Sequence, residues 1–211
     1  MPPDQAAGLR RRRGGLLPRC LHVFFDAPES THRLLAALQR IGLRTLLVDV
    51  QGRLLADSPA RSLFDWRQQL VRGTLQPLPM PHGEGWHAPG VRADAPGLAE
   101  IAQGYDLLVF DEGLGVRIPG GARSVVVEVA AGEASLQRVY AFLKTLFHRG
   151  SAPGVVLLGA PDACDRVRAA CARFLDPRFA EGIVSARHED DAFVALAVRM
   201  ADEETGRAPV Q

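Results

Sequence analysis

Two short apolar segments constrain the fold of this chain of 211 residues more than any other feature of its sequence. Residues 46–50 read Leu-Leu-Val-Asp-Val and residues 107–111 read Leu-Leu-Val-Phe-Asp, so each segment has an aspartate at or beside its end. Such runs are typical of strands buried on both faces, as in a parallel sheet covered by helices. Ligands of open α/β sheets bind at the carboxyl ends of the strands, where Asp49 and Asp111 are therefore expected. An aspartate there can hold Mg²⁺ or orient water, or it can merely end its strand and cap the next turn.

The rest of the chain alternates between strand and helix patterns. Strands are expected at residues 20–25, 44–50, 105–111, 124–129, 154–158 and 182–185, and helices at residues 33–41, 62–72, 96–103, 135–147, 162–174 and 189–201. This alternation predicts an α/β fold with a mostly parallel central sheet flanked by helices on both faces. No linker-like stretch divides it, so we expect one domain over residues 20–211.

One stretch, residues 76–90, is rich in proline and glycine and is expected to form a loop anchored by Trp86. It contains His82, Glu84 and His87, which are potential metal ligands. Their spacing is not one that would converge them on an ion, so no metal site is predicted.

Composition excludes several classes of protein. The net charge of +1 gives no strong electrostatic bias toward nucleic acid, and no apolar run is long enough to span a membrane. Cys20, Cys164 and Cys171 are sparse and lack metal-site spacing, which favours a reducing, cytoplasmic setting. Cys164 and Cys171 are expected to be small side chains that face the core.

The turn after the first expected strand lacks the features of a phosphate-binding loop. Such a loop needs glycines for close backbone approach and a lysine to contact the phosphates, but residues 26–32 contain neither. Asp26 and Glu29 would repel phosphate, and Ser30 and Thr31 could only cap the following helix. This turn argues against tight ATP binding.

The first 19 residues form a separate segment in this interpretation. Asp4 can cap a short helix over the next residues, but such a helix is too short to be stable alone in water. The basic run at residues 10–13 could bind an acidic partner or RNA, or it could be a solvated tail. We expect the segment to be mobile until a partner orders it.

Four segments together resemble the MinD/ParA group of ATPases, and most closely its flagellar regulators of the FlhG (FleN) type. Residues 4–10 are similar to the DQAxxLR activator motif of that family. Residues 37–49 are similar to its helix–glycine–strand unit that ends in an aspartate, and residues 105–115 to its Walker B strand and glycine turn. Residues 133–144 are similar to its PE-x-S-x-x-x-x-Y-x-x-x-K helix. The four matches occur in the family's order and imply the MinD/ParA-like P-loop NTPase fold.

The resemblance implies a partner for the N-terminal motif, which is an FlhF-type GTPase of the signal-recognition class. The motif residues expected to bind it are Asp4, Gln5, Ala6, Leu9 and Arg10. Gln5 would help to position the attacking water in the partner's site, as activators do when they supply groups in trans. A flagellar transcription activator is a second implied partner, and recruitment to the cell pole is implied as well.

The chain also departs from the family, because the deviant Walker A loop KGGVGKT and the C-terminal membrane helix have no counterpart. We therefore expect a regulator of flagellar number or placement that has lost ATP hydrolysis, with no catalytic residue, no stable membrane anchor and no required cofactor. Weak binding of ATP and Mg²⁺ at most is expected at a degenerate site formed by Asp49, Asp111, Gly113 and Gly115. Two alternatives stay open: an active hydrolase with an unusual loop, and a MinD/ParA-like adaptor in another polar-localisation, cell-division or transcription complex.

Overall fold

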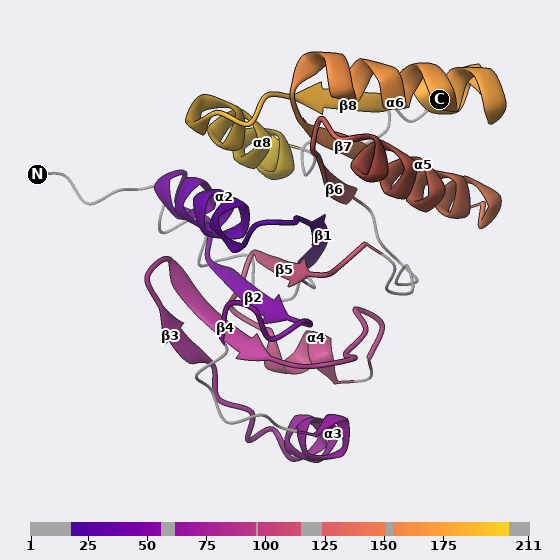
Figure 1. The fold of residues 1–211 in the computed structure, drawn as a ribbon. Coiled ribbons are helices and arrows are strands. Elements are labelled where there is room, and N and C mark those ends of the chain that lie inside the picture. The colour runs from indigo at the N-terminus through magenta and orange to yellow at the C-terminus, as the bar shows by residue number, and fades with distance from the viewer. Residues whose placement is uncertain (1–17, 56–61, 96, 115–123, 151–153, 203–211) are drawn as a thin grey trace, which may run out of the picture.

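One eight-stranded sheet runs through the computed structural model, which describes residues 18–55, 62–95, 97–114, 124–150 and 154–202 (Figure 1). The strands lie in the order β3-β4-β2-β5-β1-β6-β7-β8, and all neighbours are parallel except β3 and β4. Their bounds are β1 Arg19–Phe24, β2 Thr45–Asp49, β3 Leu78–Met80, β4 Gly83–His87, β5 Leu107–Asp111, β6 Ser124–Val129, β7 Gly154–Gly159 and β8 Ile183–Ala186. The predicted α/β fold with a mostly parallel sheet is confirmed.

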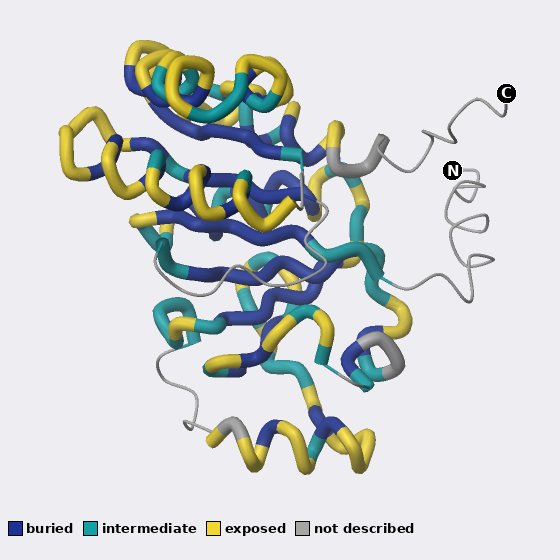
Figure 2. Tube along the Cα trace, turned by 90° about the vertical axis from the view of Figure 1, so that its right-hand side faces the viewer, coloured by how far each residue is buried: buried dark blue, intermediate teal, exposed yellow. Residues whose placement is uncertain are grey.

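Helices cover both faces of this sheet, as predicted. One face carries α2 (Pro28–Arg40) and α8 (Asp190–Asp202), which pack on each other and on the central strands. The opposite face carries α3 (Leu63–Arg72) and α4 (Leu98–Ile101) over one half of the sheet, and α5 (Glu133–His148), α6 (Pro161–Phe174) and α7 (Pro177–Glu181) over the other. Figure 2 shows the strands as a buried interior and the outer helix surfaces as exposed.

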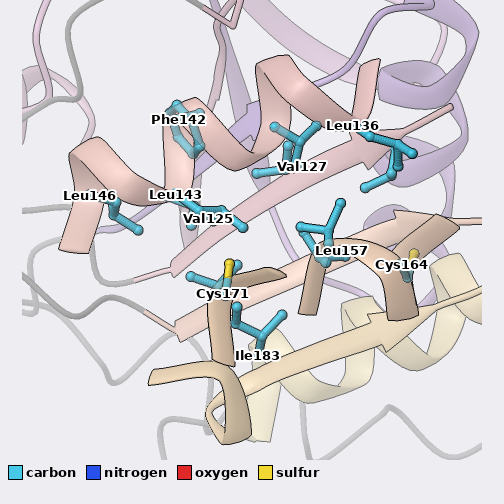
Figure 3. Close-up of a cluster of buried hydrophobic side chains, with 14 of the residues drawn as sticks. Val125, Val127, Leu136, Phe142, Leu143, Leu146, Leu157, Cys164, Cys171 and Ile183 are labelled. Carbon is cyan, nitrogen blue, oxygen red and sulfur yellow. The ribbon is translucent and has the colours of Figure 1, made fainter. Parts of the chain in front are cut away.

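The cores on the two faces follow from the alternation of side chains along each buried strand. In β6, Val125 and Val127 point toward α5 and α6, whereas Val126 points toward α8. Figure 3 shows the first of these cores, where side chains of α5 and α6 meet those of β6 and β7. Cys164 and Cys171 lie there fully buried, as predicted, and burial raises the pKa of each thiol to about 11.

The structure corrects one boundary that matters for the site. Residues 26–31 were expected to be a turn before a helix at residue 33, but α2 already begins at Pro28. Proline suits the first turn of a helix because its fixed φ is helical and its missing N–H would have no partner there. Ser30 and Thr31 therefore belong to the first turn of α2 and not to the preceding turn.

The expectation of a loop at residues 76–90 is wrong, because this stretch forms the β3–β4 hairpin and extends the sheet. Glycine makes this possible at Gly85, where an added Cβ would lie 2.7 Å from Met80 Sδ and 3.3 Å from the Leu47 carbonyl oxygen. Trp86 does act as an anchor, since it is 2% exposed and meets Trp66 of α3 edge to face. Glycine and proline hid the two-residue period that marks a strand.

The remaining elements agree with the expected order, apart from the unexpected short helix α7. Ser62 caps α3 through a capping box with Asp65, and Gly73 ends that helix in the left-handed conformation at φ +64°. No helix among the described residues is long and apolar enough to cross a membrane.

The central position of β5 gives the first testable expectation. Leu108 is 1% exposed, and its replacement in Leu108→Ala should lower the free energy of unfolding by about 2–4 kcal/mol through lost burial and a residual cavity. The matched control is Val71→Ala on α3, whose side chain is 85% exposed and whose loss should cost less than about 0.5 kcal/mol. Urea unfolding midpoints measure both, and equal midpoints for the two variants would contradict the burial of β5.

Candidate functional site

The carboxyl ends of β2 and β5 bring Asp49 and Asp111 side by side. The two residues are register partners in the parallel pair β2–β5, and both are 0% exposed. They thus lie at the edge of the sheet where ligands of open α/β folds bind. Two buried carboxylates on adjacent strands repel each other, and both stay charged only where hydrogen bonds or a cation stabilise each of them. The partners of Asp49 and Asp111 therefore decide whether either carboxylate is free to hold a ligand.

Asp49 is compensated by its own following loop. Its carboxylate accepts hydrogen bonds from four backbone N–H groups, those of Gly52 (2.7 Å), Arg53 (3.2 Å), Leu54 (2.9 Å) and Leu55 (2.8 Å). Both carboxylate oxygens are used in this way. Asp49 therefore holds the loop after β2 in place. This is the second of the two roles that the sequence allowed, in which the aspartate ends its strand and caps the next turn.

Asp111 is compensated by a side chain that sequence reasoning missed. Arg53 donates from Nη2 to both carboxylate oxygens of Asp111, at 2.9 and 3.0 Å, and from Nε at 3.3 Å. Thr31 Oγ1 donates to Oδ1 at 3.0 Å. Burial raises the pKa of Asp111, while the bonds from Arg53 and Thr31 oppose that rise and the nearby charge of Asp49 adds to it. The ion pair with Arg53 keeps a costly buried charge in place.

A third carboxylate, Glu128 of β6, closes the turn between β1 and α2. Its Oε2 accepts from the backbone N–H groups of Asp26 (2.7 Å) and Ala27 (3.3 Å), and its Oε1 accepts from Ser30 Oγ at 2.9 Å. Ala27, the N-cap of α2, has no side-chain oxygen to offer the helix. A helix N-terminus attracts anions through its free N–H groups and its dipole. At the N-terminus of α2 the carboxylate of Glu128 is the anion that occupies this position.

His188, which follows β8, connects Glu128 to α2. Arg33 Nη1 lies 3.0 Å from His188 Nδ1, and because arginine can only donate, this nitrogen must accept. The ring proton is therefore on Nε2, which lies 2.9 Å from Glu128 Oε1 and 2.8 Å from Ser30 Oγ. Arg33 also pairs with Asp190 at 2.9 Å. The charges around the turn thus form one continuous network across α2, β6 and the start of α8.

The expectation that Ser30 and Thr31 only cap their helix is wrong. Their hydroxyls instead donate to Glu128 and Asp111, carboxylates that lie 98 and 80 positions away in the sequence. In P-loop NTPases a loop Ser or Thr and a strand-end aspartate together hold Mg²⁺. Thr31 and Asp111 have that relation here, but the cation on Asp111 is the guanidinium of Arg53. With Arg53 bound to Asp111, the side chains at this edge therefore do not fit a nucleotide with its metal ion.

The other residues singled out from the sequence divide between the site and its surroundings. An added Cβ at Gly113 would lie 3.0 Å from Gln51 Oε1, so the glycine allows the loops after β2 and β5 to touch. Gly115 and the motif residues Asp4, Gln5, Ala6, Leu9 and Arg10 lie outside the described residues, as does most of the expected N-terminal segment.

The three potential metal ligands of the hairpin do not converge. Glu84 accepts from the hydroxyl of Tyr105, His82 contacts Gln39 at 3.4 Å, and the ring of His87 faces Gly52. Among the described residues no three His, Cys, Asp or Glu side chains lie close enough together to hold a metal ion.

Behind the site lies a buried pair that the sequence did not reveal. His22 Nδ1 lies 2.7 Å from Glu112 Oε1, both side chains are almost completely buried, and the ring stacks on Phe110 at 4.9 Å. Within the described part of the chain, Nε2 of His22 has no hydrogen-bond partner. The pair joins β1 to the end of β5 next to Asp111.

No family model matches this chain, and no curated protein sequence does either. Solved structures do match. A chain of the MinC:MinD cell division protein complex of Aquifex aeolicus is similar with a TM-score of 0.55 at 12% identity, over 92% of this chain and 98% of that one. A ParA family ATPase of Chlorobium tepidum is similar with a TM-score of 0.52 at 14% identity, over 91% and 93%.

A third solved structure, cobyrinic acid a,c-diamide synthase of Mycobacterium smegmatis, gives a TM-score of 0.53 at 15% identity, over 91% of this chain and 97% of that one. Identities this low show the fold alone. The chain has the fold of the MinD/ParA-type P-loop ATPases, as the resemblance implied.

The Arg53–Asp111 pair predicts a pH-dependent loss of stability. Arg53→Met should lower the free energy of unfolding by about 1–3 kcal/mol near neutral pH, because Asp111 stays charged and buried without its cation. Removing Arg53 also raises the pKa of Asp111 further. As the pH falls through that raised pKa, the folded protein takes up a proton on Asp111 that the unfolded chain does not yet bind, so the loss should shrink.

Urea unfolding of both proteins at several pH values measures this effect. Arg138→Met is the matched control, since its partner Asp26 is 44% exposed and the pair should contribute about 0.5 kcal/mol or less at every pH. A loss in Arg53→Met that is the same at neutral and acidic pH would contradict the role given to Asp111.

Proposed function

We propose that this protein is a regulator with the MinD/ParA fold that does not hydrolyse ATP and acts by binding partners. The observation that carries the proposal is the occupation of the would-be nucleotide site by the chain's own charges. Glu128 takes the N–H groups of the turn after β1, and Arg53 takes the carboxylate of Asp111. An incoming nucleotide would have to displace both groups before its phosphates and metal ion could bind.

The energetics of such a displacement are unfavourable. A triphosphate would approach a turn that already carries the charges of Asp26, Glu29 and Glu128. No lysine is at hand to contact the phosphates, because the single lysine of the chain, Lys144, is on α5. It lies 11 residues after Glu133 at the start of that helix, which is about 16 Å along the helix axis.

The partner is inferred from the N-terminal motif. The similarity of residues 4–10 to the DQAxxLR motif supports binding to an FlhF-type GTPase, and the retained fold would carry that segment. In this proposal the protein is an FlhG-like regulator of flagellar number or placement, works in the cytoplasm and is recruited to the cell pole. Gln5 supplies the activating group, because an amide can both donate to and accept from the attacking water.

A first experiment tests the nucleotide half of the proposal. Ligands that bind the native state raise the melting temperature by mass action, so millimolar Mg-ATP should shift the Tm of the wild type by no more than about one degree. In Glu128→Ala the N–H groups of Asp26 and Ala27 lose their resident anion, and inorganic phosphate should then raise the Tm more than in the wild type.

Glu133→Ala is the control for that variant, because its carboxylate is 65% exposed and its ion pair is with the exposed Arg166. A large Tm rise of the wild type with Mg-ATP, abolished in Asp111→Ala, would overturn the nucleotide half and favour an active hydrolase. If inorganic phosphate raised the Tm of Glu128→Ala and of Glu133→Ala by the same amount, Glu128 would not be blocking an anion site.

A second experiment tests the partner half. The full-length protein should accelerate GTP turnover by the FlhF-type GTPase encoded in the same genome, and Gln5→Ala should abolish most of that acceleration. Gln137→Ala, which removes an exposed amide on α5, should retain it. Unchanged GTP turnover with the wild-type protein would refute the activator role and favour an adaptor in another polar, cell-division or transcription complex.

A further inference from the structure

The outer face of α3 carries two large apolar side chains that the fold does not bury. Phe64 is 67% exposed and Val71 is 85% exposed, the two highest values among the large hydrophobic side chains of the described residues. Seven residues are almost two full helical turns, so both side chains lie on one face, about 10 Å apart along the axis. Trp66 and Leu70 of α3 point away from that face and join the core. Phe64 and Val71 therefore cannot reach the core.

This face of α3 is open to solvent. Figure 1 shows α3 at the margin of the molecule, beyond the β3–β4 hairpin, and Figure 2 shows most of its turns as exposed. Single apolar side chains are common on protein surfaces and need no explanation. Two that are aligned along one helix face at this spacing form the pattern by which a helix packs against another helix.

The charges on this face are basic. Arg67 lies between Phe64 and Val71, and Arg72 flanks them. Both arginines are exposed, and neither has an ion-pair partner among the described residues. We infer that α3 is the docking surface for an acidic amphipathic helix of a partner protein. Such a helix sets its apolar side chains on Phe64 and Val71 and its carboxylates beside the two arginines.

A second copy of this chain fits the face less well. Two α3 helices packed antiparallel about a two-fold axis would set Phe64 against Val71 of the other copy, which centres the contact between residues 67 and 68. The Arg67 side chains of the two copies would then meet on one flank as like charges. On the other flank Asp65 would approach Arg72 of the other copy, but its carboxylate already accepts from the N–H and hydroxyl groups of Ser62 at the start of α3.

An anionic membrane also fits the face less well. A helix that lies in a membrane interface buries a broad apolar face. On α3 the polar side chains of Arg67 and Gln68 separate Phe64 from Val71, so the apolar stripe is narrow. A narrow stripe with polar flanks is sufficient for packing against a single partner helix.

The end of α6 provides a matched control surface. Phe174 is 64% exposed and stands next to Arg173, so this surface also combines an exposed phenylalanine with an arginine. Here, however, the guanidinium of Arg173 lies over the Phe174 ring at 5.1 Å, and Tyr140 meets that ring edge to face at 6.5 Å. These side chains therefore have partners within the chain, and Figure 1 shows α6 at the opposite end of the molecule from α3.

Two labelled helical peptides test the inference by fluorescence anisotropy with the full-length protein at low salt. The acidic peptide has a leucine stripe of the same seven-residue spacing, flanked by glutamates, and the basic peptide has lysine in place of every glutamate. The acidic peptide should bind the wild type with a Kd on the order of 100 µM, because the contact is small. Binding should weaken as salt is raised, and the basic peptide should not bind measurably.

The apolar anchors are tested by the double variant Phe64→Ser/Val71→Ser. It should bind the acidic peptide about tenfold more weakly than the wild type, because both anchors are lost. Phe174→Ser on α6 should bind that peptide as the wild type does. The replaced α3 side chains are exposed, so the urea midpoint of the double variant should stay close to that of the wild type and serve as the check on folding.

The charges are tested by the double variant Arg67→Glu/Arg72→Glu. It should lose binding of the acidic peptide and gain binding of the basic peptide, because the face then carries the opposite charge. Arg173→Glu on α6 should leave both results as in the wild type. The exchange of peptide preference is a readout that simple loss of folding could not produce.

Several results would overturn the inference. These are the absence of acidic-peptide binding to the wild type at millimolar concentration, equal binding of the two peptides, and equal effects of the α3 and α6 variants. Sedimentation equilibrium and vesicles containing phosphatidylserine test the other occupants. A dimer that Phe64→Ser/Val71→Ser abolishes would assign the face to a second copy, and vesicle binding lost in that variant would assign it to a membrane; either result would overturn the inference. The inference does not depend on the proposed function.

Discussion

The ion pair between Arg53 and Asp111 is the interaction on which the carboxyl edge of this sheet depends. Asp49 and Asp111 are buried register partners, and such a pair is tolerable only if both charges are compensated. Four N–H groups compensate Asp49 and thereby fold the loop that carries Arg53. Arg53 then compensates Asp111 and also donates to the carbonyl oxygen of Asp26 at 3.0 Å. A single side chain thus joins the ends of β1, β2 and β5.

Glu128 completes the edge from the other side of β1. P-loop proteins with bound nucleotide place a phosphate at the N-terminus of the first helix and a metal ion near the strand-end aspartate. In this chain a carboxylate and a guanidinium stand at the corresponding places, and contacts within the chain hold both of them there.

Much of this fold was predictable because it is encoded locally. The apolar runs identified the central strands, the helical periodicity identified the long helices, and the order of the two indicated a parallel sheet. The β3–β4 hairpin was missed because Gly85 and three prolines mask its period. The sequence did contain an indication of the role of Glu128. A charged residue near the end of the buried run Ser-Val-Val-Val-Glu-Val needs a partner, which predicts a polar contact at that strand end.

By itself the sequence determined the strand–helix order, the aspartates at two strand ends and the lack of glycine and lysine in the turn before α2, because these depend on neighbouring residues. The tertiary structure alone decided which charges meet. Ser30 finds Glu128 across 98 positions and Arg53 finds Asp111 across 58. Parallel strands gather their carboxyl ends at one edge whatever their separation in the chain, and local periodicity carries no record of which side chains that edge will bring together.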